Sequence, residues 1–87
     1  MKIVAKPVDM VAIFQRGKYP MPWKFKYERQ DGTRCQVQVG QVLEFEERRY
    51  GGVPTILYRC QSHVENEDIR YELKYIMKEA RWELYKV

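Results

Sequence analysis

Several residue types that mark whole classes of protein are scarce in this chain of 87 residues. It has two cysteines, one histidine, five glycines and four prolines. Two cysteines are too few for a disulfide-stapled mini-protein, and so little glycine and proline excludes collagen-like and linker sequences. Hydrophobic residues make up 45% of the chain and aromatic residues 14%, which excludes intrinsic disorder. We expect one small domain over residues 1–87.

Long apolar runs are also missing. No segment approaches the roughly 20 apolar residues that span a bilayer, so we expect no membrane partner. The first residues lack the apolar stretch of a secretory signal, because Lys6 and Pro7 interrupt it. Two cysteines that form no disulfide pattern are typical of a protein in a reducing compartment. These absences together predict a cytoplasmic protein.

The pattern that dominates the chain has a period of two, which is typical of β-strands with one apolar and one polar face. Similar alternation occurs at 33–39, 71–75 and 81–85. The clearest case has three aromatic residues alternating with three charged ones: Trp23, Phe25 and Tyr27 with Lys24, Lys26 and Glu28. We expect the three aromatic residues to share the apolar face of this strand and the three charged residues its polar face.

Turn residues separate the expected strands. Asp31-Gly32 predicts a hairpin that joins 23–29 to 33–39, and Gly51-Gly52 separates 41–49 from 55–61. Pro20 and Pro22 cannot donate ladder hydrogen bonds, so we expect them outside central pairing. Residues 8–15 form the expected first strand, apolar enough for both faces to be covered. Gly40 interrupts a long strand-like stretch and is a candidate bulge or barrel corner.

The segment from 64 to 85 supports two interpretations. Ile69, Leu73, Ile76 and Ala80 are spaced as one stripe of a helix, whereas Tyr71, Leu73 and Tyr75 alternate as in a strand. We favour a terminal hairpin and keep a helix over 69–80, which would make the fold α+β, as the alternative.

These observations predict an all-β domain, a small, partly open barrel or strongly bent antiparallel sheet of about six strands. The expected core is apolar and largely aromatic: Phe14, Phe25, Tyr27, Val37, Val39, Leu43, Ile56, Tyr58, Leu73, Tyr75, Trp82 and Leu84.

Short elements spread along the chain carry a family resemblance. They are Val11 to Phe14, Pro22 to Tyr27, Val39 with Val42-Leu43, Gly51-Gly52, Ile56 to Cys60 and Arg81 to Leu84. Together they resemble a family of small uncharacterised β-rich, barrel-like proteins from clostridia and related Gram-positive bacteria. The resemblance implies a short single β domain in a bacterial cytoplasm. It implies no function and no site residues.

No catalytic signature is present. Cys60-x-x-His63 has metal-like spacing and Cys35 could be a third ligand, but the second pair of a structural zinc site is missing. A Cys–His nucleophile would need an orienting residue, and the sequence offers none. Gly51-Gly52 lacks the Lys and Ser/Thr of a phosphate-binding loop. We therefore expect no enzyme activity, no metal and no cofactor.

Basic residues are concentrated near the N-terminus. Residues 1–34 contain eight basic residues against three acidic ones, a net charge of +5. Small β-barrels bind single-stranded nucleic acid with positive grooves and exposed rings. The candidate residues for nucleic-acid or partner binding are basic or aromatic and lie on one expected hairpin and in one loop: Lys18, Lys24, Lys26, Arg34, Arg48, Arg49 and Tyr50.

Large apolar residues near the expected loops favour a different class. Tyr19, Met21, Trp23 and Tyr50 are of the kinds enriched in protein interfaces, and sheet edges can pair with another chain. We therefore predict a non-catalytic binding or protein-interaction module, with a protein partner or self-association favoured. Single-stranded nucleic-acid binding is the alternative, and an enzyme is a distant third.

Overall fold

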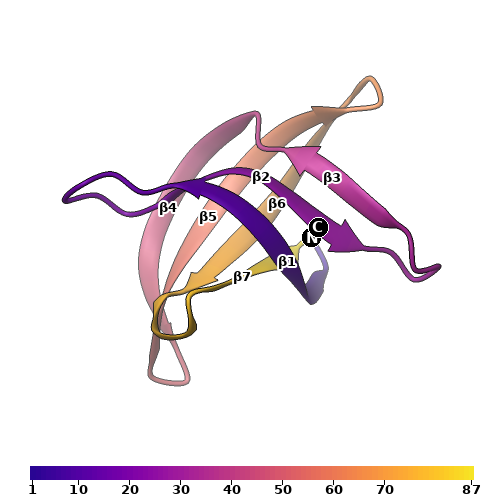
Figure 1. The fold of residues 1–87 in the computed structure, drawn as a ribbon. Coiled ribbons are helices and arrows are strands. Elements are labelled where there is room, and N and C mark those ends of the chain that lie inside the picture. The colour runs from indigo at the N-terminus through magenta and orange to yellow at the C-terminus, as the bar shows by residue number, and fades with distance from the viewer.

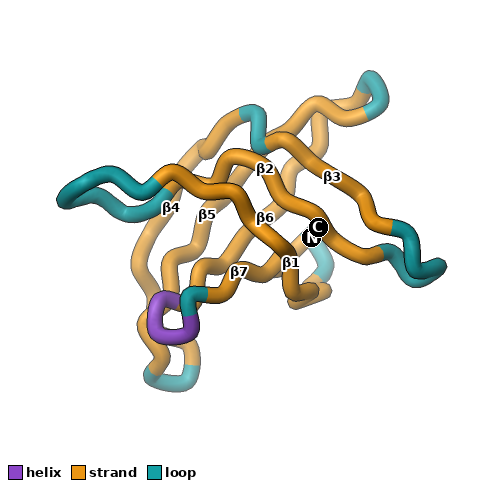
Figure 2. Tube along the Cα trace, in the orientation of Figure 1, coloured by secondary structure: helices purple, strands orange, loops and turns teal.

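The computed structural model describes residues 1–87 as one antiparallel sheet of seven strands (Figures 1 and 2). One turn of 3-10 helix, η1 (Met77–Glu79), precedes the last strand. The strands are β1 (Ile3–Ile13), β2 (Met21–Glu28), β3 (Arg34–Gln38), β4 (Gln41–Tyr50), β5 (Val53–Val64), β6 (Glu67–Ile76) and β7 (Arg81–Lys86). The prediction of an all-β, partly open barrel is confirmed, with seven strands in place of about six. No helix has the length and apolar character needed to cross a membrane.

The strand order is β3-β2-β1-β7-β6-β5-β4, so the sheet consists of two meanders that are each continuous in the sequence. The first meander is β1–β3 and the second is β4–β7. They share β1, because residues 3–8 pair with β7 whereas residues 9–13 pair with β2. The first meander therefore crosses over the second, and the sheet curls into a half-barrel (Figure 1).

A close contact at Gly40 closes one end of the half-barrel. Only Val39 and Gly40 separate β3 from β4, although these strands are the two edges of the sheet. The Gly40 N–H donates to the carbonyl oxygen of Gln61 at 3.1 Å. A Cβ at Gly40 would lie 3.0 Å from that oxygen, so a side chain does not fit without a shift. The predicted barrel corner is confirmed.

The core fills the inside of the half-barrel. Its fully buried members come mainly from the second meander, with Phe25 from the first. Tyr58 and Tyr75 pack against Trp82 there with tilted rings, the Tyr75 and Trp82 ring centroids 4.7 Å apart and those of Tyr58 and Trp82 5.3 Å apart. Burying aromatic rings of this size is a large share of what stabilises so small a domain.

Two residues expected in the core lie outside it. Phe14 follows the end of β1 and is 66% exposed, because the chain has already left the sheet. Leu43 is 41% exposed, because it is the extra residue of a β-bulge between Val42 and Glu44. The period of two assigns a bulged residue to the wrong face, since each bulge shifts the pattern by one.

β1 also differs from the expectation. It begins at Ile3 rather than near residue 8 and ends at Ile13. Half-buried and exposed residues alternate along its whole length, so only one of its faces is covered. Val11 is 46% exposed because no second layer packs on the outside of the first meander. The prediction that both faces are covered is wrong.

The two predicted hairpins are confirmed. In the β2–β3 turn, Asp31 accepts hydrogen bonds from the backbone N–H (2.9 Å) and hydroxyl (2.6 Å) of Thr33, which lower the pKa of its carboxyl group. Residues 69–85 form most of β6, η1, the turn residue Ala80 and most of β7, with Tyr75 opposite Trp82. The helix alternative is wrong, because Tyr75 and its neighbours gain cross-strand aromatic contacts that a single helix could not provide.

Candidate functional site

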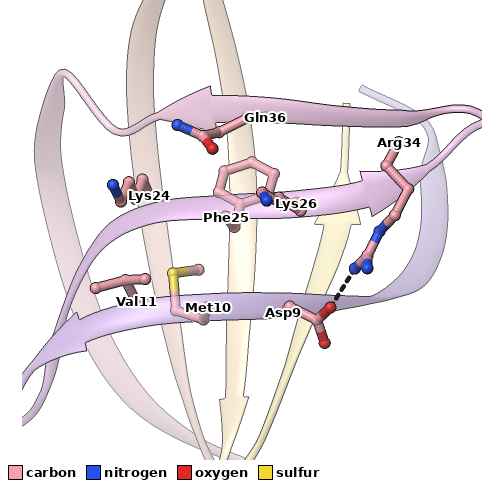
Figure 3. Close-up of a pocket in the computed structure, with 8 residues that line it drawn as sticks. All are labelled: Asp9, Met10, Val11, Lys24, Phe25, Lys26, Arg34 and Gln36. Atoms are coloured by element: carbon pink, nitrogen blue, oxygen red, sulfur yellow. Dashed lines mark hydrogen bonds and ion pairs between the residues drawn. The ribbon is translucent and has the colours of Figure 1, made fainter.

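A shallow basic groove lies on the outer face of the first meander (Figure 3). It has a volume of about 350 Å³. Lys24 and Lys26 project from β2 on the same side, as the alternation predicts, and Arg34 and Gln36 border them from β3. We call the surface of these four residues the basic groove.

One acidic residue, Asp9 on β1, lies at the border of the basic groove. Arg34 reaches across β2 and forms an ion pair with it (Figure 3). The two side chains are 56% and 76% exposed, so water screens the pair and it contributes little to stability. Asp9 also lies opposite Lys26 in the ladder. Lys24 lies opposite Val11 instead and keeps its charge unopposed there.

Trp23 adds an aromatic ring beside the groove. Lys24 lies opposite Val11 but Pro22 lies opposite Ala12, so Trp23 is the extra residue of a bulge in β2. The ring is 45% exposed, and the Lys24 Nζ lies 4.8 Å from its centroid. The expectation that Trp23 shares the apolar face of Phe25 and Tyr27 is wrong. Pro22, expected outside central pairing, pairs with Ala12 of β1 alone, because the β2–β3 ladder begins at Lys24. The bulge accommodates a residue without an N–H donor.

The other candidate residues do not join the groove. Lys18 belongs to the β1–β2 loop, where it lines a separate hollow with Tyr19, Met21 and Phe45. In Figure 1 the β4–β5 hairpin, which follows Tyr50, lies at the opposite end of the molecule from the β2–β3 hairpin. The predicted residues thus divide into three separate places: the basic groove, the β1–β2 loop and the end of β4.

At the end of β4, internal contacts engage the candidate side chains. Arg48 forms an ion pair with Glu46 at 2.5 Å, and Arg49 donates to the Gly52 carbonyl oxygen at 3.1 Å. Tyr50 packs against Tyr85, and both rings contact Lys74, whose Nζ lies 3.5 and 3.6 Å from their centroids. Burial between the rings lowers the pKa of Lys74. Tyr50 is therefore part of a packed cluster rather than a ring free to stack on a ligand.

A second site, which the sequence did not single out, is the free edge of β4. This ten-residue strand pairs only with β5, and none of the backbone hydrogen bonds outside the ladders involves residues 41–50. Alternate N–H and C=O groups of an antiparallel edge strand point away from its neighbour and are open to another strand. We call this side of residues 41–50 the β4 edge.

Apolar side chains accompany the β4 edge. Leu43 is 41% and Phe45 43% exposed. Tyr19, from the β1–β2 loop, sits edge-on to Phe45 with the ring centroids 6.1 Å apart and donates its hydroxyl to Glu47 at 2.9 Å. This hydrogen bond raises the pKa of Tyr19. The β1–β2 loop thus adds Tyr19 to Leu43 and Phe45 as a third large side chain beside the β4 edge.

The charges of β4 follow a simple order along the strand. Glu44, Glu46 and Glu47 come first, and Arg48 and Arg49 follow. Their ladder partners in β5 place Glu44, Glu46 and Arg48 on the outer face, since Arg59 and Thr55 there point away from the buried Tyr58. Phe45, Glu47 and Arg49 therefore occupy the other face.

Arg59 on β5 holds the acidic residues of the outer face in place. It contacts Glu44 at 2.8 Å, Glu46 at 3.4 Å and the largely buried Glu72 at 3.5 Å. The carboxylates raise the pKa of Arg59, foremost through the hydrogen bond to Glu44.

The thiols and the histidine lie in three different surroundings. Cys60 is buried, which raises the pKa of its thiol to about 12 and keeps it protonated. Cys35 accepts a 3.3 Å contact from Arg29, and His63 pairs with Asp68 at 3.0 Å. Nowhere do three or more His, Cys, Asp or Glu residues gather as they would around a metal ion.

Comparisons with known proteins give no further guide to these two surfaces. The chain matches no family model, no curated protein and no solved structure.

Proposed function

We propose that this protein is a non-catalytic protein-interaction module that binds an extended polypeptide segment on the β4 edge. The observation that carries the proposal is the unpaired backbone of a ten-residue edge strand next to exposed Leu43 and Phe45. Natural sheets shorten or cover such edges when they have no partner, as the five-residue β3 illustrates on the other side of this sheet.

Strand addition would use both features of the edge. Backbone hydrogen bonds supply affinity in this mode of recognition, and side chains at alternate positions supply specificity. Phe45 and Tyr19 would contribute the aromatic contacts that are enriched in interfaces. We place this interaction in the cytoplasm, since both cysteines are free thiols, as expected in a reducing compartment.

Photo-crosslinking tests this proposal. Benzoylphenylalanine would replace Phe45 in one variant and Phe14 in a matched control, since Phe14 is also an exposed phenylalanine but lies outside the β4 edge. We expect irradiation in cells to link a polypeptide to the position 45 variant and not to the position 14 variant. Equal crosslinking at both positions, or none at either, would exclude the β4 edge as an interface.

The basic groove favours single-stranded nucleic acid as a second candidate ligand. Lys24 and Lys26 would neutralise phosphates, and the Trp23 ring, which the bulge turns outward, is available for base stacking. Asp9 limits the positive potential of the groove, since it faces Arg34 and Lys26. The test is binding of labelled single strands at two salt concentrations, because phosphate contacts weaken steeply as salt rises.

A further inference from the structure

We infer that the partner of the β4 edge is a second copy of this chain, paired antiparallel about a two-fold axis at Glu47. This inference rests on the proposed function, which it makes specific. Two copies of one strand that pair antiparallel form a closed, symmetric dimer, and the two sheets become one continuous sheet.

The order of charges selects the antiparallel direction. In a parallel, in-register pair, each residue of β4 would face its own counterpart, so Glu would face Glu and Arg would face Arg. Like charges directly opposite each other destabilise a strand pair, and opposite charges stabilise it. Reversing one strand brings the acidic half of β4 against the basic half of the other copy.

The bulge and the hairpin turn select the register. β4 is regular from Glu44 to Tyr50, with the Leu43 bulge before this segment and the Gly51-Gly52 turn after it. A bulge ends regular pairing, so the whole segment can be paired only when both copies align over 44–50. The middle of that segment is Glu47, which fixes the axis there.

This register gives Glu46 and Arg48 of the outer face opposite charges across the axis, and it places Glu44 opposite Tyr50 of the partner subunit. Glu46 lies opposite Arg48 of the partner subunit, and the symmetry repeats that pair. On the other face Phe45 lies opposite Arg49 of the partner subunit, an arrangement that allows a cation–π contact. The one unfavourable pair is Glu47 with Glu47 of the partner subunit. Tyr19 already donates a hydrogen bond to that carboxylate and disperses part of its charge.

Charge reversal with complementation tests both the dimer and its register. Glu46→Arg places Arg against Arg48 of the partner subunit, and Arg48→Glu places Glu against Glu46 of the partner subunit. We expect each variant to be monomeric where the wild type has twice the 10.6 kDa mass of one chain. An equimolar mixture of the two variants should restore the dimer, because both outer pairs are then Arg–Glu. Sedimentation velocity from micromolar to near-millimolar concentration measures the masses.

Two controls keep the result interpretable. Asp9→Arg and Arg34→Asp break an exposed ion pair away from β4 and should leave the wild-type dimer intact. Far-UV circular dichroism should show the same strand content in all four variants. Hydrogen exchange of the wild type should slow at alternate amides of residues 44–50 as concentration rises.

The possible outcomes distinguish failure of the dimer from failure of the proposed interaction at the β4 edge. A monomer at every concentration that still crosslinks through position 45 would overturn the dimer and leave the interaction module standing with another polypeptide. A monomer without those crosslinks would overturn both. A dimer that both single variants leave unchanged would show that the copies meet elsewhere, which overturns the proposed register.

Discussion

The Ser62 hydroxyl on β5 donates a hydrogen bond to the carbonyl oxygen of Gln38 at the end of β3, at 2.7 Å. Ser62 is 1% exposed, and its oxygen also lies 2.5 Å from the Tyr71 hydroxyl. One side chain therefore links the first meander to the second beside the Gly40 corner, where the two edges of the sheet approach each other. Each polar group of this cluster has a partner within the protein.

Replacing Ser62 by alanine should destabilise the fold by about 1–3 kcal/mol, since it leaves the Gln38 carbonyl and the Tyr71 hydroxyl without this buried partner. Urea unfolding followed by tryptophan fluorescence measures the change. Tyr71→Phe is the matched control, because it removes one member of the cluster and keeps the Ser62–Gln38 bond. A loss as large in Tyr71→Phe as in Ser62→Ala would contradict a closing role for Ser62.

Gly40→Ala should also destabilise the protein, by roughly 1–3 kcal/mol for a side chain forced into occupied space. The clash is with the backbone oxygen of Gln61, which the ladder holds in position, so relief requires the corner to move. Thermal unfolding gives the change, with Gln41→Ala as the neighbouring control. An unchanged midpoint in Gly40→Ala would show that the corner tolerates a side chain.

The buried Cys60 thiol predicts a loss of stability in alkali. Its pKa is about 12 in the folded protein against 9.0 when exposed, so only the unfolded chain releases this proton near pH 9–10. The free energy of unfolding should be highest below pH 9 and should fall as pH rises, by at most about 1.4 kcal/mol per pH unit for one group. Urea unfolding at pH 8, 9 and 10 measures the slope, and Cys60→Ala should flatten it. An equal slope in both proteins would assign the effect to other groups.

If the basic groove binds single strands, Lys24→Glu with Lys26→Glu should abolish binding and leave the fold intact. Trp23→Ala should weaken binding by about 1–3 kcal/mol, the contribution of one stacked base. Fluorescence anisotropy with labelled DNA and RNA at low and physiological salt is the measurement. Lys2→Glu with Lys78→Glu changes the net charge equally at exposed positions outside the groove and should bind nearly as the wild type does. An equal loss of affinity in both double variants would show that net charge alone, and not the basic groove, determines binding.

The sequence predicted the fold better than the surfaces. Alternation and the Asp31-Gly32 turn depend on neighbouring residues, so the hairpins could be inferred. The bulges at Trp23 and Leu43 could not, because they depend on how a partner strand pairs and leave no mark in a period of two. Each of them left exposed a residue that alternation assigns to the apolar face of its strand.

Strand order limited the prediction of the site. Lys24 and Lys26 share a strand, so their common direction followed from alternation alone. Whether Arg48 and Tyr50 border the same surface depends on which strands are neighbours, and the sequence did not specify that. The free edge of β4 was hidden for the same reason, since a strand is an edge only in relation to the whole sheet.

The arrangement of two sequence-continuous meanders has a consequence for the folding kinetics. Every neighbouring pair within a meander is a hairpin, and hairpins form in about 1–10 μs. Only the pairing of β1 with β7 joins segments from the far ends of the chain, so it has the largest loop-closure entropy to overcome. Docking of two preformed meanders along β1 and β7 should therefore limit the folding rate. The contact between β3 and β4 should not, because only two residues connect these strands and closing that loop costs little entropy.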